Sequence, residues 1–245
     1  MAVEQGFLIF MCNKDNTIIY SVYQQMWQNA LPLITHNQIK HDANLNGKSD
    51  TRRGITLLAR IKPPVSNAIS AFLSHMQQLE PQLYYYPQSD LHVTVLSILS
   101  CSAGYQLAIE DQGDYVELIQ NVVNKTAAFK LEFKGITLAD NAIVVCGYVA
   151  DDTLAKLRAE LRQHVSASDL AHSMDTRYNL VTAHSTVARF RGDLQQPSAF
   201  ADFLQANREY SFGSLHVSQL ELVVNDWYQS KANTQVLAKM NLLKA

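Results

Sequence analysis

The sequence contains little cysteine, and this shortage excludes the classes of protein that depend on it. Three cysteines occur in 245 residues, at Cys12, Cys101 and Cys146, and they form no Cys-x-x-Cys pair. An odd number of widely separated cysteines suggests neither a disulfide framework nor a zinc cluster. We therefore expect a protein of the reducing cytoplasm.

Long apolar runs are missing as well. Gly6 to Met11 is apolar but far too short to cross a membrane, and Glu4 precedes it where a signal peptide would carry basic residues. We expect neither a signal peptide nor a membrane segment. With 47% hydrophobic and 17% charged residues, the chain should be globular, with one sizeable core or two small lobes.

The chain also lacks an excess of positive charge. The chain carries 20 Lys and Arg against 22 Asp and Glu, a formal net charge of −2. A protein that binds long nucleic acid of any sequence needs a basic surface, so this class is excluded. A small or terminal phosphate ligand remains compatible with the charge.

Residues 1–53 show no clear pattern of secondary structure. The segment from Asn37 to Arg53 is polar and turn-rich, which predicts a loop. Its basic end, Arg52-Arg53, could face a phosphate or form a solvated charge pair. We interpret residues 1–53 as an extension that packs on or precedes the core, and residues 54–245 as a single bilobal domain.

From Gly54 onward a clear order of elements appears. Ile55 to Ile61 has the composition of a buried strand and ends at Pro63-Pro64. Apolar residues at helical spacing then predict an amphipathic helix from Val65 to about Leu79. A loop containing Tyr84-Tyr85-Tyr86-Pro87 leads into a second strand, Leu91 to Val95.

The same order recurs in the second half of the chain. Ala142 to Val149 is a predicted buried strand, and Asp151-Asp152 can cap a helix whose apolar stripe runs from Leu154 to Val165. After a polar loop comes the strand Ala183 to Val187. Strand, helix, loop and strand therefore occur twice at nearly equal spacing, which indicates an internal repeat.

The remaining segments complete the expected elements. They are a helix from Tyr115 to Thr126, a half-exposed strand from Phe129 to Phe133, a helix from Ser198 to Gln205, a strand from Leu215 to Val224 and a closing strand from Thr234 to Leu243.

Each repeat ends in a His-x-Thr motif. Side chains alternate along a strand, so His92 and Thr94 share one face, as do His184 and Thr186. A single motif of this kind is more often a structural strand histidine bonded to a neighbouring carbonyl. Its presence at equivalent places in two repeats favours a shared polar site.

Two further His-x-Ser sequences compete with these motifs. His164-Val165-Ser166 lies in a helical pattern, where residues two apart do not share a face. His216-Val217-Ser218 lies in a predicted strand, so its spacing alone does not exclude it. The repeat places no motif strand there, and we therefore favour His92 and His184.

Two histidines across a cleft can provide general acid and base catalysis on a phosphodiester. One imidazole removes a proton from the attacking oxygen, and the other protonates the leaving oxygen. The hydroxyls of Thr94 and Thr186 can donate to the non-bridging phosphate oxygens. Because the histidines lack metal-ligand spacing, we expect no metal and no cofactor.

These motifs resemble those of the 2H phosphoesterase superfamily, which includes 2′,3′-cyclic nucleotide phosphodiesterases and 2′-5′ RNA ligase-like proteins. The family pattern is a hydrophobic residue, His, a hydrophobic residue, Thr or Ser, and a hydrophobic residue, twice. Leu91 to Val95 fits it fully, whereas Ala183 to Val187 departs from it at Ser185. The resemblance runs from about Gly54 to the C-terminus. It implies an α+β, bilobal, pseudo-two-fold fold with two mostly antiparallel sheets flanked by helices around a central cleft.

The resemblance also implies an activity. The leading hypothesis is a metal-independent phosphodiesterase that hydrolyses a small cyclic phosphate to a 2′-phosphate. The alternatives are 2′-5′ RNA ligation or RNA-end processing by the same residues, and a non-catalytic nucleotide-binding module. A small phosphate-containing substrate and a monomeric state are expected.

Four further residues are candidates for substrate binding. Family analogy implies that Arg189 assists phosphate binding, although strict alternation would place it on the opposite face from His184. Tyr86 and the pair Trp227-Tyr228 could stack on a nucleobase or simply pack in the core.

Overall fold

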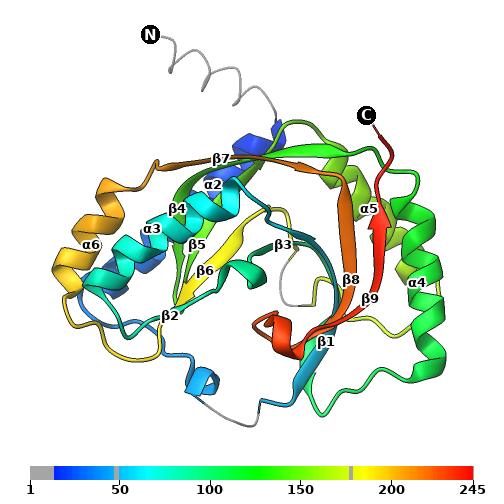
Figure 1. Ribbon diagram of the computed structural model, residues 1–245, viewed down its shortest axis with the longest axis horizontal. Coiled ribbons are helices and arrows are strands. Elements are labelled where there is room, and N and C mark those ends of the chain that lie inside the picture. Colours follow the sequence, from blue (N-terminus) through cyan, green and yellow to red (C-terminus); the bar gives the residue numbers. More distant parts are fainter. Residues whose placement is uncertain (1–13, 47–49, 177–178, 245) are drawn as a thin grey trace.

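The computed structural model describes residues 14–46, 50–176 and 179–244. The predictions for Gly6–Met11 and Cys12 lie outside these residues. Within them, the strands form two antiparallel sheets (Figure 1). The first sheet has the order β3 (His92–Ala103), β1 (Arg52–Arg60), β8 (Gln219–Asn225), β9 (Gln235–Asn241). The second has the order β2 (Tyr84–Tyr85), β6 (Ser185–Arg189), β5 (Ala142–Val149), β4 (Phe129–Ala139), β7 (Ser211–Val217).

Helices flank both sheets. The α-helices are α2 (Lys14–Thr35), α3 (Val65–Leu79), α4 (Ile109–Val123), α5 (Thr153–Ser166) and α6 (Pro197–Ala206). Short 3₁₀ turns occupy η1 (Ala43–Asn46), η2 (Gln88–Asp90) and η3 (Lys231–Asn233). In the part of the chain that the structure describes, no helix combines the length and the apolar character that a membrane crossing requires.

The two sheets are built alike, as the repeat predicts. In each sheet the motif strand, β3 or β6, pairs with the first strand of its own repeat, β1 or β5. That strand pairs in turn with β8 or β4. The helices cross between the lobes, because α3 contacts β7 while α5 contacts β3. This arrangement confirms the predicted α+β pseudo-two-fold fold.

One predicted strand was wrong. The run from Leu215 to Val224 is divided at Ser218 into β7 and β8, which belong to different sheets. Apolar alternation continues through both strands, so the local pattern cannot reveal that the chain passes from one sheet to the other. His216 therefore lies in β7, opposite Lys130, with an exposed side chain.

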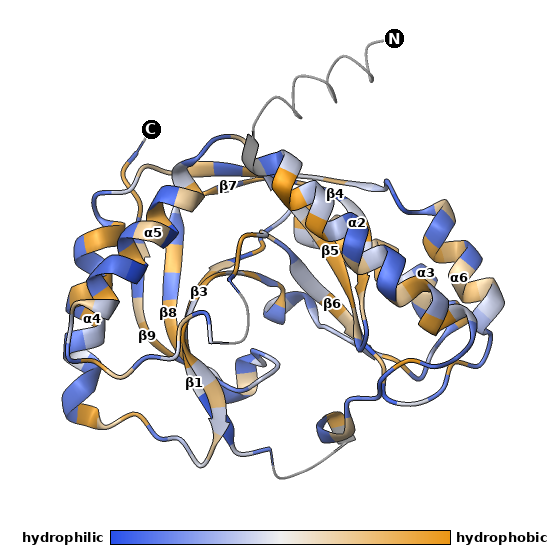
Figure 2. Cartoon of the chain, turned by 180° about the vertical axis from the view of Figure 1, so that it is seen from behind, coloured by the Kyte–Doolittle hydropathy of each residue, from blue (hydrophilic) through white to orange (hydrophobic). Residues whose placement is uncertain are grey.

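Helix α2 was not predicted. Its buried stripe consists of Ile19, Tyr23, Trp27, Ala30 and Ile34, which is helical spacing. Polar residues between them and a proline within the helix obscure the pattern. In Figure 2, α2 crosses in front of β4 and β5, which it contacts.

Side chains of α2 replace a missing strand beside β5. Because β6 pairs with β5 only over residues 142–145, the outer backbone groups of Gly147 and Val149 have no strand partner there. The Asn16 amide donates to the Val149 carbonyl and accepts from its N–H, at 2.8 and 3.1 Å. The Tyr23 hydroxyl donates to the Gly147 carbonyl and accepts from its N–H, at 3.1 and 3.2 Å. Helix α2 is thus bound to the core, while the domain boundary at residue 53 stays a prediction.

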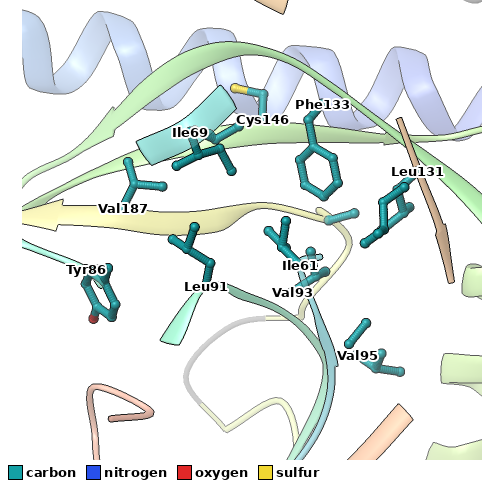
Figure 3. Close-up of a cluster of buried hydrophobic side chains, with 14 of the residues drawn as sticks. Ile61, Ile69, Tyr86, Leu91, Val93, Val95, Leu131, Phe133, Cys146 and Val187 are labelled. Atoms are coloured by element: carbon teal, nitrogen blue, oxygen red, sulfur yellow. The ribbon is translucent and has the colours of Figure 1, made fainter. Parts of the chain in front are cut away.

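The apolar backs of the motif strands meet in the core. Leu91, Val93, Val95 and Val187 point into one buried cluster together with Phe133 (Figure 3). Burial of these side chains orients the opposite faces of β3 and β6 toward the cleft.

Candidate functional site

A cavity of about 250 Å³ lies where β3 and β6 approach each other, and all four motif side chains line it. They are His92 and Thr94 from β3, His184 just before β6, and Thr186 within β6. The alternation argument correctly predicted that each histidine shares a face with its threonine.

A β-bulge occurs in β3 directly after its motif threonine. Thr94 pairs with Leu58 of β1, but the next pair joins Leu96 to Leu57, so that Val95 has no partner. An extra residue in one strand reverses the direction of the side chains that follow. Val95 and Leu96 are both buried, and Leu96 also lines the cavity.

Strand β6 carries the same bulge at the equivalent place. Thr186 pairs with Val144 and Ala188 with Ile143, which leaves Val187 without a partner in β5. Val187 and Ala188 are both buried. The next side chain therefore returns to the face of Thr186, and Arg189 lines the cavity. Strict alternation, which places Arg189 on the opposite face, was wrong because it assumes an unbroken strand.

Three side chains hold Arg189. Its Nε donates to the Tyr86 hydroxyl at 2.9 Å, and its Nη1 lies 3.6 Å from Asp42 Oδ2. Its guanidinium carbon lies 5.5 Å from the centre of the Tyr228 ring. Asp42 is buried, and sequence reasoning missed it because nothing distinguishes it within its polar loop.

Both candidate tyrosines line the cavity, and both have engaged hydroxyls. Tyr86 is 4% exposed and binds Arg189, while the Tyr228 hydroxyl donates to Asp42 Oδ1 at 2.9 Å. The ring of the neighbouring Trp227 is less buried and also lines the cavity. Of these three aromatic rings, that of Trp227 is thus the most accessible.

The predicted basic pair Arg52-Arg53 lies at one side of the site. Arg52 forms an ion pair with Asp50 at 2.6 Å and lies 4.8 Å above the Trp227 ring. It is thus neither a solvated charge nor a residue of the cavity lining.

The two histidines are anchored differently through Nδ1. His92 Nδ1 lies 2.7 Å from the Asp90 carbonyl oxygen. A carbonyl only accepts, so His92 Nδ1 carries the proton and its Nε2 has the free lone pair. His184 Nδ1 lies 2.7 Å from the Thr182 hydroxyl, which can donate.

Burial is the main influence on the basicity of both rings. Burial, with a smaller contribution from the Arg60 cation, lowers the pKa of His92 to about 4. Burial also lowers the pKa of His184 to about 4, with added effects of Arg158 and of His92 itself. Both rings are therefore neutral at pH 7 in the unliganded protein.

Arg158 of α5 connects strand β3 to the segment that leads into β6. It is buried and donates to the carbonyls of Thr94 and Val95 at 3.0 and 2.8 Å, and of Val181 and Thr182 at 3.0 and 2.8 Å. Sequence reasoning missed this residue. The available signal was a charged residue on the apolar stripe of its helix.

The competing histidines lie elsewhere. His216 is on the exposed face of β7, and His164 Nδ1 bonds to the Glu160 carbonyl on α5 at 2.8 Å. Neither lines the cavity. Across the described residues, no three His, Cys, Asp or Glu side chains gather as metal ligands.

A comparison with known protein families shows which family the chain belongs to. The model of the 2′-5′ RNA ligase superfamily matches residues 63–228, a stretch that includes both motifs. The chain belongs to this superfamily. Membership of a superfamily of phosphoesterases and ligases supports an enzyme. No curated protein matches the chain significantly.

Solved structures share the fold of this family member. The crystal structure of TT0787 of Thermus thermophilus has a TM-score of 0.59 at 16% identity, covering 77% of this chain and 97% of its own. E. coli LigT complexed with 3′-AMP has a TM-score of 0.52 at 13% identity, covering 78% and 98%. The Agrobacterium tumefaciens protein ATU0111, of unknown function, has a TM-score of 0.52 at 16% identity, covering 87% and 97%.

Proposed function

We propose that this family member is a metal-independent phosphodiesterase that hydrolyses a small cyclic phosphate, such as a nucleoside 2′,3′-cyclic phosphate. The observation that carries the proposal is the meeting of His92, Thr94, His184 and Thr186 in one cavity. Family membership supports phosphoester chemistry, and the LigT complex with 3′-AMP supports a nucleotide-sized ligand.

The anchoring of the histidines supports distinct roles. His92 has its free lone pair on Nε2 and acts as the general base. Within the described residues, the Thr182 hydroxyl has its one hydrogen bond with His184 Nδ1. Donation from this hydroxyl places the proton of the neutral His184 ring on Nε2, so that His184 has no lone pair there with which to act as the base. As an imidazolium, with Nδ1–H donating to the Thr182 hydroxyl instead, the ring carries the Nε2 proton that a general acid gives up. The negative charge of a bound phosphate raises the pKa of both rings and helps them to hold the proton.

The reaction follows from these positions. His92 Nε2 removes a proton from water as the water oxygen attacks phosphorus. The bond between phosphorus and the leaving oxygen breaks, and the proton of His184 Nε2 passes to that oxygen. Thr94 and Thr186 donate to the non-bridging oxygens, and the Arg189 cation offsets their negative charge.

A screen of cyclic phosphates with product analysis tests this function. We expect turnover of at least one nucleoside 2′,3′-cyclic phosphate, and we expect it to persist in EDTA. A reversible requirement for added divalent metal would contradict the metal-independent mechanism. Turnover of no cyclic phosphate, with end joining of RNA instead, would favour the ligase alternative. Nucleotide binding without turnover of either would favour a binding module.

A further inference from the structure

The wall of the catalytic cavity offers little positive charge. Among the described residues that line it, Arg189 is the one Lys or Arg side chain and Asp175 is the one carboxylate. Both motif histidines are neutral at pH 7 in the unliganded protein, because burial lowers the pKa of each ring to about 4. Asp175 is offset by Arg162, whose Nε and Nη2 donate to its carboxylate at 2.6 and 3.0 Å. Arg189 is therefore the cation that an incoming phosphate meets.

Arg189 itself has a counter-ion beside it. Asp42 Oδ2 lies 3.6 Å from Arg189 Nη1, and Asp42 is buried but is not among the residues that line the cavity. Its other oxygen, Oδ1, accepts from the Tyr228 hydroxyl at 2.9 Å and from the Asn44 N–H at 3.3 Å. Three groups thus hold the carboxylate next to the guanidinium. The pair of Arg189 and Asp42 adds no net charge to the site.

The backbone around Asp42 is fixed as well. The N–H groups of Lys40 and Asp42 donate to the carbonyls of Asp140 and Phe190, each at 2.9 Å. Phe190 directly follows Arg189, so this segment is docked at the end of β6. It lies outside residues 63–228, which the superfamily model matches. The carboxylate thus reaches the site from a part of the chain that the family match does not include.

A counter-ion at this place acts unequally on substrate and product. A phosphodiester carries one negative charge, whereas a phosphomonoester carries about two at neutral pH. Asp42 repels each of these charges, so its repulsion is stronger for the monoester. Because the pair is buried, salt screens this repulsion less than it would at the surface. A cation with a carboxylate beside it therefore favours the diester more than the cation alone would.

We propose that Asp42 is a specificity-determining residue, which makes the site prefer phosphodiester monoanions to phosphomonoester dianions. The inference rests on the proposed function and names the charge state that its site selects. Hydrolysis of a cyclic phosphate yields a monoester and, at neutral pH, releases a proton. The product thereby gains a charge that Asp42 repels. It leaves the cavity more readily, and free mononucleotides compete poorly with the substrate.

Two ligands that differ in charge but hardly in shape test this selection. The first is adenosine 2′-phosphate, the product expected from the cyclic nucleotide. The second is adenosine 2′-methylphosphonate, in which a methyl group replaces one phosphate oxygen and leaves one negative charge. Calorimetry gives the Kd of each ligand, and the ratio of the two Kd values measures the charge selection.

The variants change one carboxylate at a time. Asp42→Asn removes the charge but keeps an oxygen for the Tyr228 hydroxyl, and Asp42→Ser removes the same charge if Asp42→Asn does not fold. Asp42→Glu keeps the charge. Asp193→Asn, at a side chain that is 73% exposed, is the control for the loss of a carboxylate elsewhere.

Asp42→Asn should tighten the binding of the phosphate, relative to that of the methylphosphonate, at least about fivefold. Asp42→Glu and Asp193→Asn should leave the ratio as it is in the wild type. A merely structural role of Asp42 would weaken both ligands together and leave their ratio unchanged. An unchanged ratio in the folded charge-removing variant, or failure of the wild type to bind either ligand, would overturn the selection.

Steady-state kinetics connect the selection to turnover. The inhibition constant of adenosine 2′-phosphate, relative to KM for adenosine 2′,3′-cyclic phosphate, should fall in Asp42→Asn by a similar factor. Failure of the wild type on every cyclic phosphate would count against the proposed function. The ratio of the two Kd values would still decide the role of Asp42, so the two failures are distinguishable.

Discussion

At the scale of single residues, the two motif histidines are equivalent in sequence but differ in what holds them. A backbone carbonyl fixes the His92 ring, and a side-chain hydroxyl fixes the His184 ring. A carbonyl permits one tautomer, whereas a hydroxyl can permit the other. In the proposed mechanism, this difference assigns the role of base to His92 and that of acid to His184.

Replacement of either histidine should abolish most of the activity. We expect His92→Ala and His184→Ala each to lower kcat/KM by about 10²- to 10⁴-fold, because each removes one proton transfer. Thr94→Ala and Thr186→Ala should cost less, since a hydroxyl bond to phosphate contributes only a few kcal/mol, at most about 4. Steady-state kinetics on a cyclic phosphate measure this. His216→Ala is the control, and damage there as severe as at the motifs would mean that the wrong pair was chosen.

The buried histidines should also make the protein sensitive to acid. Each has a folded-state pKa of about 4 against an ordinary value near 6.5, so the unfolded state takes up protons first as the pH falls. Stability should therefore be unaffected above pH 6.5 and decrease between pH 6.5 and 4. From pH 7 to 5 the loss is about 2 kcal/mol per histidine.

Urea unfolding at both pH values measures this effect. In His92→Gln, the decrease in the free energy of unfolding from pH 7 to pH 5 should be smaller than in the wild type by about 2 kcal/mol. His216→Gln controls for the substitution at an exposed position. An unchanged difference in His92→Gln would show that the ring is not held neutral.

At the scale of elements, helix α5 joins the two halves of the site through Arg158. Arg158→Met should leave two carbonyl oxygens of β3 and two of the segment that precedes β6 without their donor, at a cost of about 3 kcal/mol or more. Urea unfolding measures the loss. Lys156→Met, on the same helix, removes an exposed ion pair with Asp152 and should leave the free energy of unfolding almost unchanged. Equal losses in the two variants would contradict the linking role.

Strand β5 allows the second motif to approach only because residue 147 is glycine. A Cβ at Gly147 would lie 1.9 Å from the Ala183 carbonyl oxygen, and Ala183 precedes His184. Gly147→Ala should therefore cost about 1–3 kcal/mol and lower kcat by displacing the histidine. Gly192→Ala, where a Cβ meets nothing within 4 Å, is the matched control. Urea unfolding and steady-state kinetics on the same samples measure the losses of stability and of kcat. A normal kcat in Gly147→Ala would show that the glycine is not needed to position His184.

At the scale of the whole molecule, the site exists only where the two sheets meet. Thr94 comes from one sheet and Thr186 from the other, while Trp227 follows β8. If the lobes hold base and phosphate together, only one ester oxygen lies opposite the attacking water. We expect a single 2′-phosphate product from a 2′,3′-cyclic nucleotide, read by phosphorus NMR. A mixture of isomers in the wild type would show that the base is not held.

The sequence by itself determined the local order of the molecule. Helix α3 and strand β5 have the predicted bounds, and the repeat correctly indicated two similar lobes. The alternation of side chains along a strand also predicted that His92 lies on the same face as Thr94, and His184 on the same face as Thr186. These features depend on the periodicity of neighbouring residues, which a single sequence displays directly.

Only the tertiary structure decided how the site is completed. The bulge that turns Arg189 into the cavity depends on the register of β6 against β5, which no residue of β6 reveals alone. Asp42 and Arg158 reach the motifs from positions far away in the chain. The passage from β7 to β8 likewise changes sheets within one continuous apolar pattern. Each of these features is a contact between distant segments, and side-chain periodicity carries information only about the segment in which it occurs.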